Sequence, residues 1–226
     1  MTSIPTGPGA AVEAEAEKHR AAEAAAQLVG SGMTVGLGTG STVAYLLPAL
    51  AARELRIVCV ATSVPTEQEA RRLGLDVLLF DRLDRLDIAI DGADQVARDF
   101  WLVKGGGGAH TREKIVAAAA DRFVVIVSSD KLVEAVAGPV PLEVLGFGLG
   151  ATLRELERLG ECRLRGSPPT PDGGILIDYF GPVVDPAELS ERLDAIPGVV
   201  GHGLFPPSLV REVVVGRPAG VDHLVP

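Results

Sequence analysis

Short apolar runs alternate with longer segments of helical periodicity between residues 11 and 137. The runs "RLDIAIDG" (85–92) and "FVVIVSS" (123–129) have uniformly apolar centres, "IAI" and "FVVIV", which is typical of strands covered on both faces of a parallel sheet. This alternation predicts an α/β fold: a Rossmann-like, open, mostly parallel sheet with helices on both faces. Helices are expected at 11–29, 41–50, 65–74 and 111–122, with Thr111 as the N-cap of the last, and further strands at 33–38, 55–62, 75–80 and 100–105.

The pattern changes after residue 137, where "AGPVPLEVLGFGLG" interrupts any long element with prolines and glycines. A helix (150–160), two strands joined by "SPPTPDGG", and a second helix (186–196) then predict a small inserted α+β domain of ferredoxin-like type. The apolar run in the tail "REVVVG" is expected to return to the first sheet. We therefore predict a catalytic domain at 1–137 and 208–226, and a smaller domain at 138–207 that supplies oligomer contacts.

Composition limits the functions open to this chain. With 47% hydrophobic residues among 226, it can fill a substantial core, and its net charge of −9 argues against a nucleic-acid partner. Two cysteines form neither a disulfide framework nor a metal pattern, and the four histidines show no paired spacing. No apolar run is long enough to cross a membrane, and the first residues lack the features of a secretion signal. We expect a cytoplasmic protein without a membrane partner.

The first candidate site is "GLGTGST" at 36–42, between a predicted strand and a predicted helix. Its glycines allow backbone N–H groups to approach an anion at the positive end of the helix. Ser41 takes the place of the small third residue of a dinucleotide motif, and no lysine follows the last glycine as in a Walker loop, so NAD and nucleotide triphosphates are disfavoured. A tight turn without any ligand is the alternative.

Two further segments directly follow predicted strands. "DGAD" brings Asp91 and Asp94 to the end of one strand, where they can bind sugar hydroxyls and pass protons, or merely cap a turn. Neither a third carboxylate nor a histidine stands nearby for a metal. Ligands bind at the carboxyl ends of parallel strands. We therefore expect "GLGTGST", "DGAD" and a third segment, "KGGGG" at 104–108, to line one cleft.

The third segment, "KGGGGAHTREK" at 104–114, combines a lysine, four glycines and a glutamate in the first turn of a helix. Glu113 can simply offset the helix dipole, which also lowers the pKa of a carboxylate and weakens it as a base until substrate desolvates it. A carboxylate opposite Lys104 and backbone donors is also the equipment for removing a proton from carbon next to a carbonyl. Of the four histidines, His110 alone borders this segment.

Taken together, these motifs resemble those of type A ribose-5-phosphate isomerases. "GLGTGST", "IDGADQV", "LVKGGGGAHTREKIVA", "SSDK", "VPLEV", "IPGVVGHGLF" and "VVVG" occur in that family's order along nearly the whole chain. The resemblance implies interconversion of D-ribose 5-phosphate and D-ribulose 5-phosphate through a cis-enediol in the pentose phosphate pathway, without cofactor or metal. It also implies a homodimer or homotetramer.

Carried over by motif, the resemblance makes Glu113 the base that moves a proton between C1 and C2, and Lys104 the group that stabilises the oxyanion. Asp91 and Asp94 would bind the sugar and assist ring opening, and Lys18 in the first helix would approach the phosphate. The remaining substrate-binding residues implied are Thr39, Gly40, Ser41, Thr42, Gly92, Ala93, Gly105, Gly106, Gly107 and Lys131.

A departure from the family pattern and two rival functions are visible in the sequence. Gln95 stands where the family has glutamate, which removes any charge at that position. The alternative function is a non-catalytic, sugar-phosphate-sensing module of the kind found in bacterial repressors; the chain carries no basic helix-turn-helix for DNA binding. A CoA transferase or another sugar-phosphate isomerase would be expected to lack the "KGGGG…TREK" arrangement.

Overall fold

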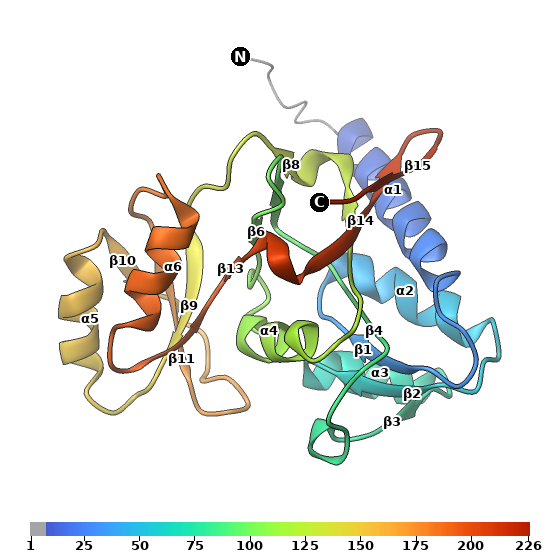
Figure 1. The fold of residues 1–226 in the computed structure, drawn as a ribbon, viewed down its shortest axis with the longest axis horizontal. Helices are drawn as coiled ribbons and strands as arrows, with labels where there is room; N and C mark the ends of the chain where they lie inside the picture. The colour runs from blue at the N-terminus through green and yellow to red at the C-terminus, as the bar shows by residue number, and fades with distance from the viewer. Residues whose placement is uncertain (1–7) are drawn as a thin grey trace. The chain divides into compact units, whose positions relative to one another are not determined.

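The computed structural model describes residues 8–226 (Figure 1). The chain folds into two compact units. Unit 1 contains the described residues up to Gly92, Val116–Leu132 and Val210–Pro226, and unit 2 contains Ala93–Ile115 and Val133–Leu209. The sequence-based division at 137 and 208 places 93–115 with the first domain, whereas in the structure this segment packs as part of unit 2. Residues 1–7 of that predicted domain lie outside the described residues.

Unit 1 is built on a seven-stranded sheet with the order β15-β14-β7-β4-β1-β2-β3. All neighbouring strands are parallel except β15, which forms an antiparallel hairpin with β14 at one edge, drawn in red in Figure 1. The strand from the tail therefore returns to the first sheet, as predicted. The strands are β1 (Thr34–Leu37), β2 (Val58–Ala61), β3 (Asp76–Val77), β4 (Ile88–Asp91), β7 (Phe123–Ser128), β14 (Val210–Arg217) and β15 (Gly220–Leu224).

Helices cover both faces of this sheet. Successive residues of a strand point to opposite sides, so an apolar strand presents two apolar faces, and each is covered by helices. Val35 and Leu37 of β1 belong to the apolar cluster that includes α1 (Pro8–Ala26) and α2 (Ser41–Ala51), with Ala70 of α3 (Val64–Arg72) in the same cluster. Gly36 faces the other way, where a Cβ atom would lie 2.5 Å from Val116 of α4 (His110–Ala118). The predicted α/β fold class is confirmed.

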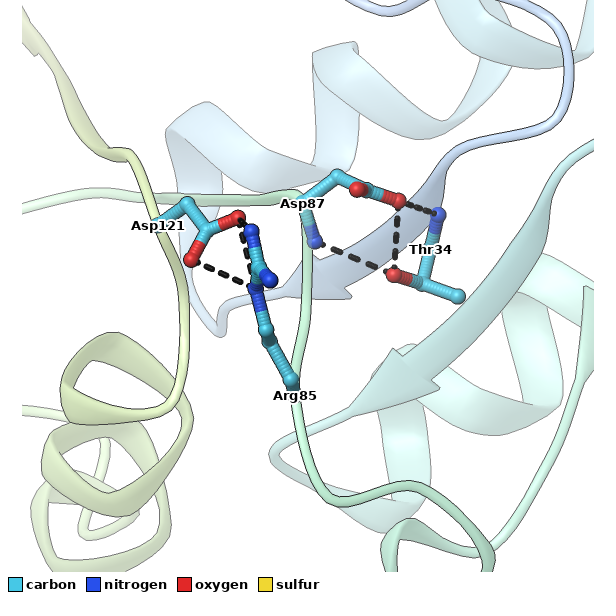
Figure 2. Close-up of polar contacts among 4 residues, drawn as sticks. All are labelled: Thr34, Arg85, Asp87 and Asp121. Carbon is cyan, nitrogen blue, oxygen red and sulfur yellow. Dashed lines mark hydrogen bonds and ion pairs between the residues drawn. The ribbon is translucent and has the colours of Figure 1, made fainter.

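At the N-terminal ends of β1 and β4, polar contacts link the strands (Figure 2). The Asp87 carboxylate accepts hydrogen bonds from the Thr34 backbone N–H (2.7 Å) and hydroxyl (2.9 Å). These contacts hold the pKa of Asp87 below its usual value. Arg85 forms a bidentate ion pair with Asp121 beside them. These contacts join the strands at their N-terminal ends, whereas the sequence motifs lie at the carboxyl ends of the same strands.

Unit 2 contains a four-stranded antiparallel sheet with the order β10-β11-β9-β12. The chain order β9, α5, β10, β11, α6, β12 is the βαββαβ arrangement of ferredoxin-like domains, as predicted. Apolar residues such as Leu142, Ile177 and Leu193 form its core. These elements are β9 (Val140–Val144), α5 (Leu149–Glu157), β10 (Cys162–Leu164), β11 (Ile175–Tyr179), α6 (Pro186–Asp194) and β12 (Val199–His202).

A third, small sheet has the order β13-β6-β5-β8 and carries Lys104 directly after β6. The sequence-based expectation placed the strand at 100–105 in the parallel sheet, and this was wrong. β6 instead forms an antiparallel hairpin with β5, in whose turn Phe100 adopts a left-handed conformation (φ 64°). The strands are β5 (Gln95–Ala97), β6 (Leu102–Val103), β8 (Leu132–Val133) and β13 (Leu204–Phe205).

Candidate functional site

In unit 1, the "GLGTGST" loop and Asp91 lie where the strand order reverses. β1 and β4 are neighbours, and the chain leaves them toward opposite edges of the sheet, which is the topological switch point where such sheets bind ligands. The buried Asp91 accepts hydrogen bonds through Oδ1 from the backbone N–H groups of Thr39 (3.0 Å) and Gly92 (2.7 Å). A Cβ atom on Gly38 would lie 1.9 Å from Asp91 Cγ. Glycine at 38 therefore allows this carboxylate to order the loop.

The loop leads into α2, whose N-terminus has no side-chain cap. Gly40 is the N-cap residue, with φ 126°, and the exposed Ser41 and buried Thr42 begin the helix. Helix N-termini present backbone N–H groups and a partial positive charge, which together attract anions such as phosphate. This geometry fits the anion-binding role expected of Thr39, Gly40, Ser41 and Thr42.

Three hydroxyl side chains support the loop from the turn after β2. The Thr62 hydroxyl lies 2.8 Å from that of Thr39, and Thr66 donates a hydrogen bond to the Gly38 carbonyl (3.0 Å). Ser63 donates to the Thr66 hydroxyl in turn (3.0 Å). All three lie in the "ATSVPTEQEA" segment, whose sequence gives no indication of which hydroxyls face the loop.

Two lysines of unit 1 were predicted to assist. Lys131 follows β7, the neighbour of β4, so it lies at the same edge of the sheet as Asp91; it is half-exposed and pairs with Asp130 (3.2 Å). Lys18 on α1 pairs with Glu15 (2.6 Å), which also accepts a hydrogen bond from Tyr45. Lys131 thus lies at the end of the sheet that carries Asp91, its role at the site stays a prediction, and Lys18 is engaged by a carboxylate of its own helix.

In unit 2, Lys104 and Glu113 form a buried ion pair. Lys104 Nζ lies 3.1 Å from Glu113 Oε2, and the two side chains are only 2% and 4% exposed. Lys104 is placed by the end of β6, and Glu113 by the first turn of α4. A buried ion pair is costly to maintain, so its position directly beside a glycine-rich loop makes the pair a candidate for a functional site.

The glycine loop between them is fixed by polar contacts. Gly105 and Gly108 have φ values of 107° and 75°, which side-chain-bearing residues rarely adopt. The exposed Asp94 accepts a hydrogen bond from the Gly106 N–H (2.8 Å). Asp94 therefore orders the loop after β6 much as Asp91 orders the loop after β1. Gly107 is exposed at the tip.

Arg165, which the sequence did not single out, holds the same loop from the other side. Its guanidinium donates to the carbonyls of Gly105 (2.8 Å) and Gly106 (3.3 Å), and binds Asp178 in a bidentate pair (2.6 and 2.9 Å). His110 is fully buried, and its ring would lie 2.7 Å from a Cβ atom on Gly105. Burial, followed by the charges of Lys114 and Arg165, lowers the pKa of His110 to about 3, so the ring is neutral.

Two sequence-based expectations need correction or refinement here. Thr111 is not the N-cap of α4, because the helix begins at His110 and the Thr111 hydroxyl is buried without a hydrogen-bond partner among the described residues. Gln95 has a structural role, since its amide donates to the Ala137 carbonyl (2.9 Å) and accepts from the Ala137 N–H (2.8 Å). The expectation that all three loops line one cleft stays a prediction.

Comparisons with known proteins identify one family over most of the chain. The family model described as "Ribose 5-phosphate isomerase A (phosphoriboisomerase A)" matches residues 58–220, and that of the "DeoR C terminal sensor domain" matches residues 13–75. The ribose-5-phosphate isomerase A of Gluconobacter oxydans is 46% identical over 92% of this chain and 96% of its own length. That of Gloeobacter violaceus is 47% identical, with the same shares covered.

Solved structures give the same result. The ribose 5-phosphate isomerase A of Methanocaldococcus jannaschii has a TM-score of 0.88 and 37% identity, covering 93% of this chain and 98% of its own. A D-ribose-5-phosphate isomerase in complex with phospho-erythronic acid has a TM-score of 0.89 and 34% identity, covering 94% and 99%. Among the described residues, no helix has the length and apolarity needed to span a membrane.

Proposed function

Because the chain belongs to the ribose 5-phosphate isomerase A family, we propose that it interconverts D-ribose 5-phosphate and D-ribulose 5-phosphate. The observation that carries this proposal is the buried pair of Lys104 and Glu113 on either side of an ordered glycine loop. Such a pair supplies a base and an oxyanion stabiliser together, which is what proton transfer next to a carbonyl requires.

The reaction is assigned to Glu113 as base. Its carboxylate removes the proton from C2 of the open-chain aldose, and the electrons of that C–H bond form the C1–C2 double bond while O1 becomes negative. Glu113 then returns the proton to C1, and the proton of the 2-hydroxyl moves to O1 as C2 becomes the carbonyl carbon. The net change is one hydrogen moved between carbons and one moved between oxygens.

Lys104 and the loop stabilise the negative oxygen in this scheme. The ammonium faces Glu113 before substrate binds, so an enediolate competes with the carboxylate for the same cation. The relative solved with phospho-erythronic acid supports this, since that ligand joins a carboxylate to a phosphorylated polyol chain. An acid group of this kind resembles the charge of an enediolate.

The remaining predicted residues are assigned to binding. We assign the phosphate to the α2 N-terminus and Lys131, and the sugar hydroxyls and ring opening to Asp91 and Asp94, each of which already orders a loop. Gly92, Ala93, Gly105, Gly106 and Gly107 supply the backbone beside these groups. The scheme uses no cofactor and no metal ion.

The reaction itself is the first test. Purified protein is expected to convert ribose 5-phosphate to the ketose in the presence of EDTA. Glu113→Gln should lower kcat by about 10² to 10⁴ while substrate still binds, which is the usual contribution of a positioned base. Glu134→Gln, which removes an exposed carboxylate paired with Arg98, is the matched control and should leave kcat unchanged. Turnover that depends wholly on added metal, or a near-normal kcat in Glu113→Gln, would contradict the scheme.

A second substitution separates binding from chemistry. Lys104→Ala should lower kcat, because the ammonium acts on charge that develops during the reaction. A change confined to KM would make Lys104 a binding residue instead.

The sensing alternative is not favoured. The match to the DeoR C terminal sensor domain covers the switch-point loop but ends before Lys104 and Glu113. Tight binding of ribose 5-phosphate without turnover would favour a sensor.

We also propose a cytoplasmic homo-oligomer, a dimer or tetramer. Phe147 and Leu145, directly after β9, are 94% and 51% exposed and are apolar, which favours contact with another copy. Light scattering after size-exclusion chromatography should give a mass of two or four chains, and a monomer would refute the assembly. The reduced, unpaired Cys59 and Cys162 fit a reducing compartment.

A further inference from the structure

The "HGLF" part of the late motif, residues 202–205, lies directly against Lys104. β13 pairs antiparallel with β6, which places Leu204 opposite Val103. The backbone N–H of Lys104 donates to the Gly203 carbonyl (2.8 Å), and a Cβ atom on Gly203 would lie 2.1 Å from the Lys104 carbonyl oxygen. Only glycine permits this approach, so the segment fixes the backbone from which Lys104 extends.

The Phe205 ring contacts the ammonium groups of two lysines. Lys104 Nζ lies 5.4 Å from the ring centroid, and Lys114 Nζ lies 5.1 Å from it. Both distances fall within the range of cation–π attraction. The ring is fully buried, which strengthens such contacts because water does not compete. Lys114, the residue after Glu113 on α4, therefore shares a support with the lysine that pairs with Glu113.

His202 holds Lys114 from the other side. Lys114 Nζ lies 3.3 Å from His202 Nδ1, which also accepts a hydrogen bond from the Leu204 N–H (3.2 Å). The opposite nitrogen, Nε2, lies 3.3 Å from a carboxylate oxygen of Asp194. An Nδ1 that accepts two donors and an Nε2 that faces a carboxylate define one tautomer, with the proton on Nε2. Burial lowers the pKa of His202 to about 4, so it remains a neutral acceptor.

The charges around Lys114 leave its ammonium weakly compensated. The exposed Asp194 is the carboxylate that raises the pKa of Lys114, while His202 and His110, one turn earlier on α4, are neutral. Lys104 on the shared ring is paired with Glu113. Burial is the larger effect and lowers the pKa of Lys114 to about 8.

We propose that Lys114 is a positioning residue for the isomerisation: held by His202, it fixes the Phe205 ring on which Lys104 rests, and through it the Lys104–Glu113 pair. This inference rests on the proposed function, because that function gives the pair its role. The proposed function and the proposed role of Lys114 can be refuted separately. An inactive wild-type protein refutes the function, whereas an active protein whose kcat does not change when Lys114 is replaced refutes only the positioning role.

The test is Lys114→Met, which removes the charge and keeps most of the side-chain stem. We expect kcat to fall about 3- to 30-fold, the range of one cation–π contact, with KM changed less than about twofold. Lys114→Arg should restore most of kcat, because a cation returns to the ring. Arg98→Met, which removes an exposed cation of the same unit, is the control and should match wild type.

The pH profile distinguishes positioning from simple loss of packing. Lys114 is charged below its pKa, so its contribution is lost as pH rises through about 8. Wild-type kcat should therefore decline near pH 8, Lys114→Met should lack this decline, and Lys114→Arg should shift it above about pH 10, because a guanidinium stays protonated there. An unchanged kcat and alkaline limb in Lys114→Met would overturn the proposal, and so would an effect on KM alone.

A second variant examines the ring. Phe205→Leu keeps an apolar core residue, and circular dichroism with a thermal melt shows whether it folds. If folded, it should lower kcat as Lys114→Met does, and the double variant should be little worse than either single one, because both remove the same contact. Fully additive effects would refute a shared support. If Phe205→Leu does not fold, the Lys114 variants alone decide the matter.

Discussion

Replacing Arg165 by methionine should separate the stability of unit 2 from the order of the glycine loop. Arg165 makes two kinds of contact: a bidentate pair with Asp178, and hydrogen bonds to the carbonyls of Gly105 and Gly106. Methionine preserves much of the side-chain volume but none of the donors. Both effects can be estimated from the geometry.

The stability cost comes mainly from Asp178. Leaving one partner of a fully buried ion pair uncompensated costs about 3–5 kcal/mol, and since both side chains are about a fifth exposed we expect about 2–4 kcal/mol. For a chain of this size that lowers Tm by about 4–16 °C. The loop also loses its carbonyl contacts, and a displacement near 1 Å beside the reacting atoms costs about 10²-fold. We therefore expect kcat to fall about 10- to 100-fold.

Two variants make the prediction decisive when thermal melts and turnover of ribose 5-phosphate are measured together. Arg163→Met removes a neighbouring arginine whose contacts, with Glu161 and the face of Phe180, are exposed, and it should change Tm and kcat little. In Arg165→Met/Asp178→Leu both charges are gone, so Tm should largely recover while kcat stays low. A wild-type kcat in folded Arg165→Met would show that Arg165 does not hold the catalytic loop.

Three further outcomes follow from the structure. Gly38→Ala should lower kcat at least about 10-fold, because its Cβ would displace Asp91, whereas Gly150→Ala, with open space around it, should not. Hydrogen bonds from Thr34 lower the pKa of Asp87 in the folded state, so this carboxylate stabilises the fold above its unfolded-state pKa and loses the effect as pH falls through its folded-state pKa. In urea unfolding, Asp87→Asn should therefore be less stable than wild type at pH 7, and the two stabilities should converge toward pH 3. A difference that stays constant with pH would refute this. Burial raises the pKa of Cys59 to about 12 and that of Cys162 to about 11, so at pH 8 a disulfide reagent should titrate them only after denaturation.

The sequence predicted most of the elements of unit 1, because buried parallel strands produce continuous apolar runs. It missed β9, where Pro141 stands in a strand at the centre of a sheet. Proline lacks the N–H that a central strand needs. The structure resolves this, because β12 pairs only with Leu142 to Val144. Beside Pro141 lies Gly203, whose N–H donates to the Pro141 carbonyl (2.7 Å) and whose own carbonyl accepts from the Lys104 N–H, so no proline N–H is needed. It also missed the hairpin before Lys104, whose turn has Phe100 in a conformation usually left to glycine.

In the candidate site, the residues close together in sequence were predicted, whereas the contacts from distant parts of the chain were not. Lys104, the glycine loop and Glu113 lie within ten residues of one another and carry a recognisable pattern. Arg165 and Phe205 reach the same group from about 60 and 100 residues further along the chain. An arginine after a short strand and a phenylalanine in an apolar run are ordinary features of any sequence. Contacts of this kind follow from the tertiary fold, which single-residue patterns do not encode.

The four glycines therefore do not make the loop after Lys104 a flexible one. Asp94 binds the N–H of Gly106, Arg165 binds the carbonyls, and the buried His110 ring packs against Gly105. A Cβ atom on Gly105 would lie 2.7 Å from His110 Nδ1, and one on Gly106 would lie 2.9 Å from Asp94 Oδ1, so close approach favours glycine at both positions, and the φ of 107° favours it further at Gly105. Rigidity here has an electrostatic purpose: backbone dipoles stabilise a developing oxyanion best when they need no reorganisation as the charge forms.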